Sequence, residues 1–216
     1  MHRGEPKQAQ EDTLKHRHDV LVEIGRTIVL ASETMFIDLD VEADGKPGYG
    51  SMTAIGAVTP DGETFRREIK PAHAEFDPDM RAFNDSHGFE HDRLLEEGVP
   101  ISQVMHELND WVVAERGYKT SILTAFNVGF DFGWVDYEMA GAEIESPFGI
   151  AGYCLKSLAM SLPLIQSDKS YNWESTKKST LPKLLVPQRE FTHDPLDDSL
   201  WQQELHFAMV GLLISS

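Results

Sequence analysis

Apolar and polar residues alternate most regularly just after residue 34. The apolar residues are Met35, Ile37, Leu39 and Val41, and the residues that alternate with them are Phe36, Asp38, Asp40 and Glu42. A period of two predicts a β-strand with one apolar face and one face rich in carboxylates. Residues 51–58 and 64–70 predict two further strands, joined by the turn Pro60-Asp61-Gly62. The pattern therefore predicts a three-stranded antiparallel meander at the start of the sheet.

Helical spacing follows the meander, because apolar residues recur there every three or four positions. This spacing predicts helices over 101–112, from residue 130 and over 155–162, with a short strand over 121–125. Asp194 and Pro195 predict the start of a last helix, since a capping side chain precedes a proline in the first helical position. Strands followed by helices and a further strand indicate an α/β fold with a mixed sheet.

The segment before the meander has a different character. Residues 1–18 are polar and lack periodicity, which predicts a tail or a frayed helix. The apolar run over 20–30 contains charged residues and follows a long polar lead, so it is a poor signal peptide. It could instead dock on the edge of the sheet as a short helix. We predict an N-terminal extension or tail over residues 1–34, dispensable for activity, and one folded domain over residues 35–216.

Composition narrows the class of protein. A chain of 216 residues with 41% hydrophobic and 25% charged residues is long enough to bury a core as a single domain. The only cysteine, Cys154, excludes an internal disulfide and a cysteine-rich zinc module. No apolar run approaches the roughly 18 residues of a membrane span. A reducing cytoplasm is the expected compartment, and the sequence does not indicate an oligomeric state.

Charge is distributed unevenly along the chain. There are 19 basic and 36 acidic side chains, for a net charge of −17. Residues 35–150 carry a net charge of −15, whereas residues 151–191 carry +3. This excludes a protein that coats nucleic acid uniformly, and it suits an acidic site that gathers divalent cations beside a basic edge that meets a polyanion. Many soluble proteins without such a site are also acidic, so this alternative stays open.

Three clusters contain the candidate chemistry. Asp40 and Glu42 project from one face of the first strand, about 6–7 Å apart, and can share a divalent cation. Asp131 follows a strand end at the start of a helix, where α/β proteins place their sites, although an acid also stabilises a helix start. His193 and Asp198 flank the start of the last helix. Their spacing is a weak signal, because His87 and Asp92 repeat it.

The order of these clusters is more specific than any one of them. Asp-x-Glu-x-x-Gly at residues 40–45, Asn-x-x-x-Asp at 127–131 and His-x4-Asp at 193–198 together resemble the DEDD exonuclease superfamily, in its histidine-bearing branch. The resemblance covers about residues 35–210, and residues 86–90 resemble the His-Gly-Ile-type connection of that family. It implies a ribonuclease H-like fold, in which helices flank a mixed central sheet of an antiparallel N-terminal meander and parallel strands. The family's third motif follows Asp131, so His87 is not the expected catalytic histidine.

The resemblance also implies a function for residues 35–216. It is that of a metal-dependent 3′→5′ exonuclease, which hydrolyses single-stranded DNA or RNA ends to nucleoside 5′-monophosphates. Asp40, Glu42, Asp131 and Asp198 would hold two Mg²⁺ or Mn²⁺ ions, and His193 would be the general base. Hard cations prefer such oxygen ligands, and two ions about 3.5–4 Å apart activate water and stabilise the leaving oxyanion. Histidine accepts a proton near neutral pH, since its pKa is about 6.5.

Substrate contacts are predicted at two places. Asp44 stands where the family often has a threonine near the terminal nucleotide. Lys177 and Lys178 belong to the basic stretch 151–191, which also contains Tyr171 and Trp173. Lysines near aromatic rings suit a single strand, whose phosphates pair with charge and whose bases stack. The alternative is a solvated loop.

Two other functions fit the same motifs. A ribonuclease H-type endonuclease also uses clustered carboxylates on this fold, but a histidine five residues before Asp198 favours the exonuclease. A catalytically idle nucleic-acid-binding subunit could keep the fold, but all five catalytic positions are filled. The residues do not distinguish DNA from RNA, because the groups that would sense a 2′-hydroxyl cannot be placed.

Overall fold

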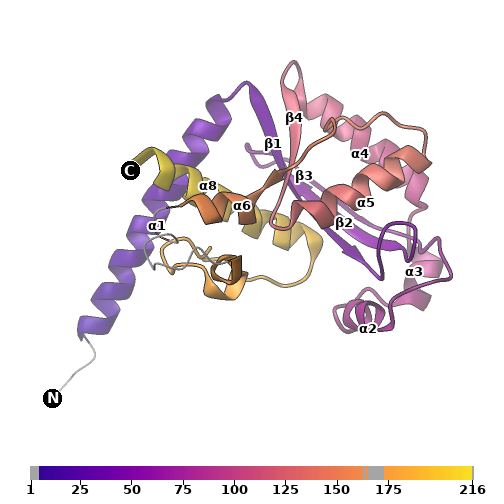
Figure 1. Cartoon of the computed structure of the whole chain (residues 1–216), viewed down its shortest axis with the longest axis horizontal. Helices are drawn as coiled ribbons and strands as arrows, with labels where there is room; N and C mark the ends of the chain where they lie inside the picture. The colour runs from indigo at the N-terminus through magenta and orange to yellow at the C-terminus, as the bar shows by residue number, and fades with distance from the viewer. Residues whose placement is uncertain (1–4, 163, 165–172, 216) are drawn as a thin grey trace.

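A mixed sheet occupies the centre of the molecule. The structure is a computed structural model that describes residues 5–162, 164 and 173–215. Its strands are β1 (Thr34–Ala43), β2 (Met52–Val58), β3 (Thr64–Glu68), β4 (Thr120–Ala125) and β5 (Tyr153–Cys154), in the spatial order β3-β2-β1-β4-β5. The first three pair antiparallel, and β4 and β5 continue the sheet in parallel (Figure 1). The predicted meander and mixed sheet are confirmed.

Helices flank this sheet. They are α1 (Glu5–Ala31), α2 (Pro78–Ser86), α3 (His91–Glu97), α4 (Ile101–Arg116), α5 (Val128–Gly141), α6 (Leu155–Ser161) and α8 (Pro195–Ser215), with short 3₁₀ turns η1 (Trp173–Thr176) and η2 (Lys178–Thr180). The predicted helices correspond to α4, α5, α6 and α8, whereas α2, α3 and β5 were not predicted. Lys169 and Tyr171 of the basic stretch lie outside the described residues.

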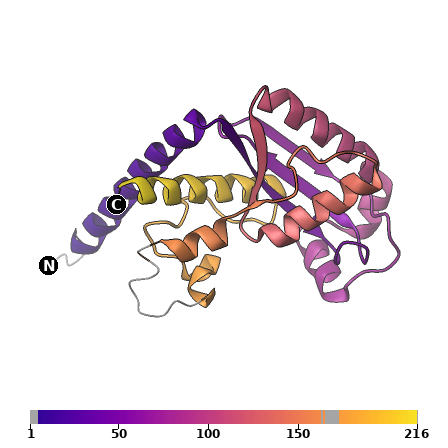
Figure 2. The ribbon, with the colours of Figure 1, turned by 45° about the horizontal axis from the view of Figure 1, so that its top comes forward.

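The two faces of β1 have different neighbours. The side chains of Ile37 and Leu39 are fully buried in the main core, which α4 and α5 complete. The acidic face is covered by α8, so Asp38 is only 1% exposed. Figure 2 shows α8 beside α1, with its N-terminal part reaching the sheet. The carboxylates of β1 therefore lie at a buried contact between strand and helix.

The described part of the N-terminal segment is helical, which is one of the two alternatives predicted for it, a tail or a frayed helix. Residues 5–31 form one helix, α1, which crosses α8 and packs against it (Figure 2). The polar stretch is helical because its apolar continuation anchors it, with Leu21 and Val29 buried. His18 is also buried and contacts the Glu204 carboxylate and the Leu184 carbonyl oxygen, both at 2.9 Å. The apolar run docks as the alternative anticipated, but chiefly on α8.

Two glycines set the distance between α1 and α8. A Cβ added to Gly25 would lie 1.8 Å from the Phe207 carbonyl oxygen, and one added to Gly211 would lie 2.0 Å from that of Leu21. Gly25→Ala should therefore force the helices apart and lower the free energy of unfolding by about 1–3 kcal/mol. Thermal unfolding measures this effect. The matched control is Gly133→Ala in α5, where an added Cβ meets nothing within 4 Å; an equal loss there would contradict the contact.

None of the helices within the described ranges has the length and apolar character needed to cross a bilayer.

Candidate active site

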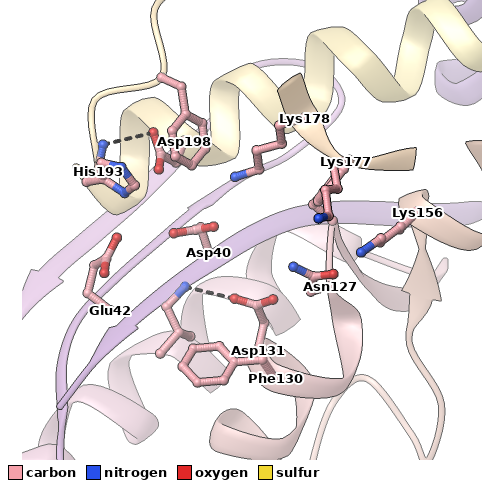
Figure 3. Close-up of a pocket in the computed structure, with 13 residues that line it drawn as sticks. Asp40, Glu42, Asn127, Phe130, Asp131, Lys156, Lys177, Lys178, His193 and Asp198 are labelled. Atoms are coloured by element: carbon pink, nitrogen blue, oxygen red, sulfur yellow. Dashed lines mark hydrogen bonds between the residues drawn. The ribbon is translucent and has the colours of Figure 1, made fainter. Parts of the chain in front are cut away.

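Most of the predicted site residues meet in one cavity of about 420 Å³. It lies where the end of β1, the start of α5, the turn η2 and the start of α8 converge (Figure 3). Its lining includes Asp40, Glu42, Asn127, Asp131, Lys156, Lys177, Lys178, His193 and Asp198. Thus the five predicted catalytic residues and both predicted lysines are brought together, whereas Asp44 is not part of this lining.

Strand lengths explain why the acids of β1 face an open space. Pairing between β1 and β4 runs from Thr34 to Asp38, and β1 then continues beyond the end of β4. The backbone amide of Val41 is left without a partner strand on that side. It donates instead to Oδ1 of Asp131 at 3.0 Å, which fixes this carboxylate against β1. The carboxyl end of the parallel strands is where α/β proteins place ligands.

The start of α8 holds the other half of the site. The side chain of Asp194 accepts hydrogen bonds from the amides of Leu196 and Asp197, which confirms the predicted cap. Asp194 also pairs with Arg66 of β3 at 2.8 Å. His193 has φ +63°, a left-handed conformation that is uncommon outside glycine. Its amide donates to Oδ1 of Asp198 at 3.3 Å.

A ladder of side chains connects α8 to the acidic face of β1. Its rungs are Asp38 with His206, Asp40 with Gln202, and Glu42 with Asp198. Four residues of a helix rise about 6 Å, and two residues of a strand rise about 6.6 Å. The antiparallel helix and strand therefore stay in register over these three pairs. Gln202, which is fully buried, donates to Oδ1 of Asp40 at 2.8 Å.

Gln202 and His206 were not predicted from the sequence to be part of the site. Their signal was the spacing of four from Asp198, which places all three on one face of the helix. Gln202 also accepts a hydrogen bond from the Phe126 amide at the end of β4. It therefore orients Asp40 while tying α8 to the sheet.

The donor set fits a hard divalent cation. Among the described residues, Glu42, His193 and Asp198 each offer a ligand atom within 4.8 Å of the other two. Oδ2 of Asp198 is buried and has no hydrogen-bond partner within the described ranges. A buried carboxylate oxygen without a partner is costly unless a cation binds it. Asp40 and Asp131 line the same cavity outside this group, so their carboxylates are also available to a cation.

Burial, assisted at some positions by neighbouring carboxylates, destabilises the charged forms of these acids. Burial, reinforced by the charge of Asp198, raises the pKa of Glu42 to about 8. Burial also raises the pKa of Asp131 to about 7 and that of Asp198 to about 6. The pKa of Asp40 is raised well above its ordinary value by burial and then by the charge of Asp131. A bound cation reverses this effect, because it favours the ionised carboxylates.

These pKa shifts predict how the metal-free protein responds to pH. Carboxyls with raised pKa values bind more protons in the folded than in the unfolded state. Their stabilising contribution is complete below about pH 4 and is lost as pH rises through about 6 to 8. Each pKa unit corresponds to about 1.4 kcal/mol, or about 2–4 °C in Tm for a chain of this size.

We therefore expect Tm in chelator to fall by several degrees relative to Tm in saturating Mn²⁺ between pH 5 and 8. Differential scanning calorimetry measures both curves. Parallel curves in chelator and in Mn²⁺ would contradict the raised pKa values of the buried acids.

His193 lies in an aromatic setting. The centroids of Phe83, His87 and Phe191 are 4.7, 4.6 and 4.8 Å from that of the His193 ring. Burial, and then the charges of His87 and Lys178, lower the pKa of His193. A lowered pKa keeps the imidazole neutral near pH 7, as a general base requires. His87, which the motif order excludes as the catalytic histidine, is thus a neighbour of the predicted base.

Asp44 is placed differently from its predicted role in substrate binding. Its side chain is 2% exposed and pairs with Arg81 at 2.6 Å, and its Oδ1 accepts from the Ser51 amide at 2.6 Å. Both oxygens are thus satisfied inside the loop after β1. A register shift between Glu42 and Ala43 breaks the strand alternation just before Asp44, so proximity to Glu42 in the sequence does not bring it into the cavity.

The two predicted lysines have different surroundings. Lys177 is exposed and forms an ion pair with Glu174. Lys178 points into the cavity toward Asp40, and its Nζ lies 3.2 Å from the centroid of the Phe191 ring (Figure 3). Lys156 also lines the cavity, with its Nζ 4.6 Å from the centroid of Trp173. Basic and aromatic side chains therefore border the acidic site on one side.

Solved structures of other proteins share this fold. The nuclease domain of 3′hExo, a DEDDh family member bound to rAMP, superposes with a TM-score of 0.60 at 14% identity, covering 84% of this chain and 92% of that chain. S. pombe Pop2p with bound Mg²⁺ and Mn²⁺ has a TM-score of 0.54 at 12% identity, covering 91% and 88%. No family model matches the chain. The predicted ribonuclease H-like fold is confirmed.

The amino-acid sequence is also similar to that of one characterised exonuclease. The chain is 27% identical over 175 residues to the 3′-5′ DNA exonuclease Cap18 of Escherichia coli, across 79% of this chain and 89% of that protein. The resemblance to DEDDh exonucleases, predicted from the motif order, is confirmed by this relative and by the solved structures together.

Proposed function

We propose that this protein is a metal-dependent 3′→5′ exonuclease that releases nucleoside 5′-monophosphates from single-stranded ends. The observation that supports this most strongly is the convergence of four carboxylates and His193 around one cavity in a ribonuclease H-like fold. Similarity to a protein named as a 3′-5′ DNA exonuclease supports the same reaction and direction. We assign Asp40, Glu42, Asp131 and Asp198 as ligands of two Mg²⁺ or Mn²⁺ ions.

Different residues of the site have different roles in hydrolysis. Divalent ions, when bound, polarise the scissile phosphate and lower the pKa of water. Asp198 and Glu42 face each other beside His193, so this group holds the attacking water next to a base. His193 accepts the proton of that water through its imidazole. Gln202 keeps Asp40 in one orientation, and the Val41 amide does the same for Asp131.

The substrate is proposed to enter over the basic border of the cavity. Lys156 and Lys177 would contact phosphates upstream of the reacting end, because both line the cavity beside the acids. We propose DNA as the first substrate to test, since the relative from E. coli is named as a DNA exonuclease. The solved domain of 3′hExo is bound to rAMP, so RNA belongs in the same assay. The reducing cytoplasm stays our proposed compartment on composition alone.

One assay tests the proposed function. Single-stranded DNA and RNA, each labelled at the 5′ end, are incubated with Mg²⁺, with Mn²⁺ and with chelator. We expect a ladder that shortens from the 3′ end, mononucleotide products, and no reaction in chelator. A single internal cut would indicate an endonuclease, and activity in chelator would refute metal dependence.

Charge reversal at the basic border should separate binding from chemistry. Lys156→Glu with Lys177→Glu is expected to raise KM for long strands more than for a dinucleotide, because phosphates away from the reacting end contribute only binding. The salt dependence of binding should flatten, with a slope smaller by about 1.4 for two lost contacts to a single strand. The control pair Lys70→Glu with Lys183→Glu makes the same charge change outside the cavity lining. Equal effects of both pairs would identify a solvated loop.

A further inference from the structure

Lys178 occupies an unusual place for a lysine that would only contact phosphate. Its side chain extends from η2 across a set of aromatic rings. Its Nζ lies 3.2 Å from the centroid of Phe191 and 5.4 Å from those of Phe126 and Trp201. Aromatic faces attract a cation, so these rings form a seat for the ammonium group. The seat holds the ammonium at the wall of the cavity, directed inward (Figure 3).

The charge of this ammonium acts on the whole acidic cluster. Lys178 lines the same cavity as the four predicted ligands, Asp40, Glu42, Asp131 and Asp198, and its ammonium is directed toward Asp40 (Figure 3). Within the described ranges, no ion pair joins it to a single carboxylate. Lys178 therefore faces the four acids as a group. Lys177, the next residue, is exposed and pairs with Glu174 instead.

We propose that the Lys178 ammonium is a built-in counter-ion of the acidic site, which stabilises the cluster when it is metal-free and opposes the binding of divalent cations there. The inference rests on the proposed metal-dependent function and deepens it. Four buried carboxylates repel one another, and a nearby positive charge relieves part of that repulsion. The same positive charge repels an arriving cation, so the two effects have one origin. Metal affinity is thereby set below what the carboxylates alone would give.

Neutral substitutions of Lys178 test both effects without measuring catalysis. Lys178→Met keeps the length and the apolar contact with the rings but removes the charge. Isothermal titration calorimetry with Mn²⁺ should show affinity increased by about tenfold, within the usual range of coupling between two sites. The Tm in chelator should fall relative to the wild-type protein, and saturating Mn²⁺ should abolish that difference. Lys178→Gln, a second neutral variant, should behave alike.

Two control variants isolate the charge and its position. Lys178→Arg keeps a positive charge and should retain Mn²⁺ affinity close to that of the wild-type protein. Lys183→Met removes a positive charge from an exposed position outside the cavity lining and should change neither Mn²⁺ affinity nor Tm in chelator. Unchanged or weaker Mn²⁺ binding by both neutral variants of Lys178 would overturn the proposal. So would an equal gain in Lys183→Met, because that gain would reflect net charge alone.

Folding failure is also informative. Neutral variants that fold only with Mn²⁺ support the proposal, because the metal then replaces the missing cation. Neutral variants that fail to fold even with Mn²⁺ overturn it, since Lys178 would then be needed for packing. Absence of Mn²⁺ binding by the wild-type protein would refute the metal-dependent function itself. If instead the wild-type protein binds Mn²⁺ and the neutral variants show no gain in affinity, only the role of Lys178 is refuted.

Discussion

Asp40→Asn and Asp198→Asn are each expected to reduce exonuclease turnover by about 10³-fold or more while the fold stays intact. Metal ions contribute several kcal/mol of stabilisation to such transition states, and about 4 kcal/mol corresponds to this factor. Asparagine keeps the volume and one acceptor oxygen. In Asp198→Asn that oxygen can still accept from the Thr192 amide, as Oδ1 of Asp198 does at 3.0 Å. The loss would therefore report the missing charge.

The measurement is a single-turnover rate with Mg²⁺, together with Tm in chelator. Removing one charge from a cluster of acids should leave that Tm unchanged or raise it. Asp197→Asn is the matched control, because Asp197 is exposed on the same helical turn outside the cavity lining. Turnover like that of the wild-type protein in either Asp40→Asn or Asp198→Asn would refute the metal assignment.

His193→Ala is expected to lower the rate by about 10²–10⁴-fold, the usual contribution of a general base. Mn²⁺ binding should largely survive, because the carboxylates remain. Calorimetric titration of Mn²⁺ tests this directly. Glu42, His193 and Asp198 lie close enough for His193 to be a ligand, so loss of a bound ion in His193→Ala would change its role from base to ligand.

His87→Ala is the control for this experiment. The two imidazoles are neighbours, with ring centroids 4.6 Å apart, but His87 is outside the cavity lining. We expect its removal to lower the rate much less than removal of His193. A larger effect of His87→Ala would show that the wrong histidine was chosen between the two His-x4-Asp matches.

The sequence predicted the parts of the site that depend on local periodicity. Alternation from Met35 to Glu42 was enough to predict β1 and the face on which Asp40 lies, because a strand has only two faces. Asp194 and Pro195 likewise predicted the start of α8, since capping is a local property. The order of the motifs then indicated which acids meet, which periodicity alone cannot do.

Residues that depend on distant partners were not predicted. Gly25 permits α1 to pack on α8 because the backbone of Phe207 lies directly against it. The residues near Gly25 in the sequence do not indicate this distant neighbour. Asp44 follows the first motif closely, but Arg81 takes its carboxylate into the loop. Lys177 and Lys178 are the same residue type in consecutive positions, and only the aromatic seat distinguishes them.

The ladder between α8 and β1 has a consequence for biosynthesis. Its rungs join residues far apart along the chain: 162 residues separate Asp40 from Gln202, and 168 separate Asp38 from His206. Contacts of such separation form late in folding, because a long loop must close first. A nascent chain on the ribosome carries Asp40 and Glu42 early but lacks the helix that completes their site. The site would thus become complete only after α8 has been translated and has docked on β1.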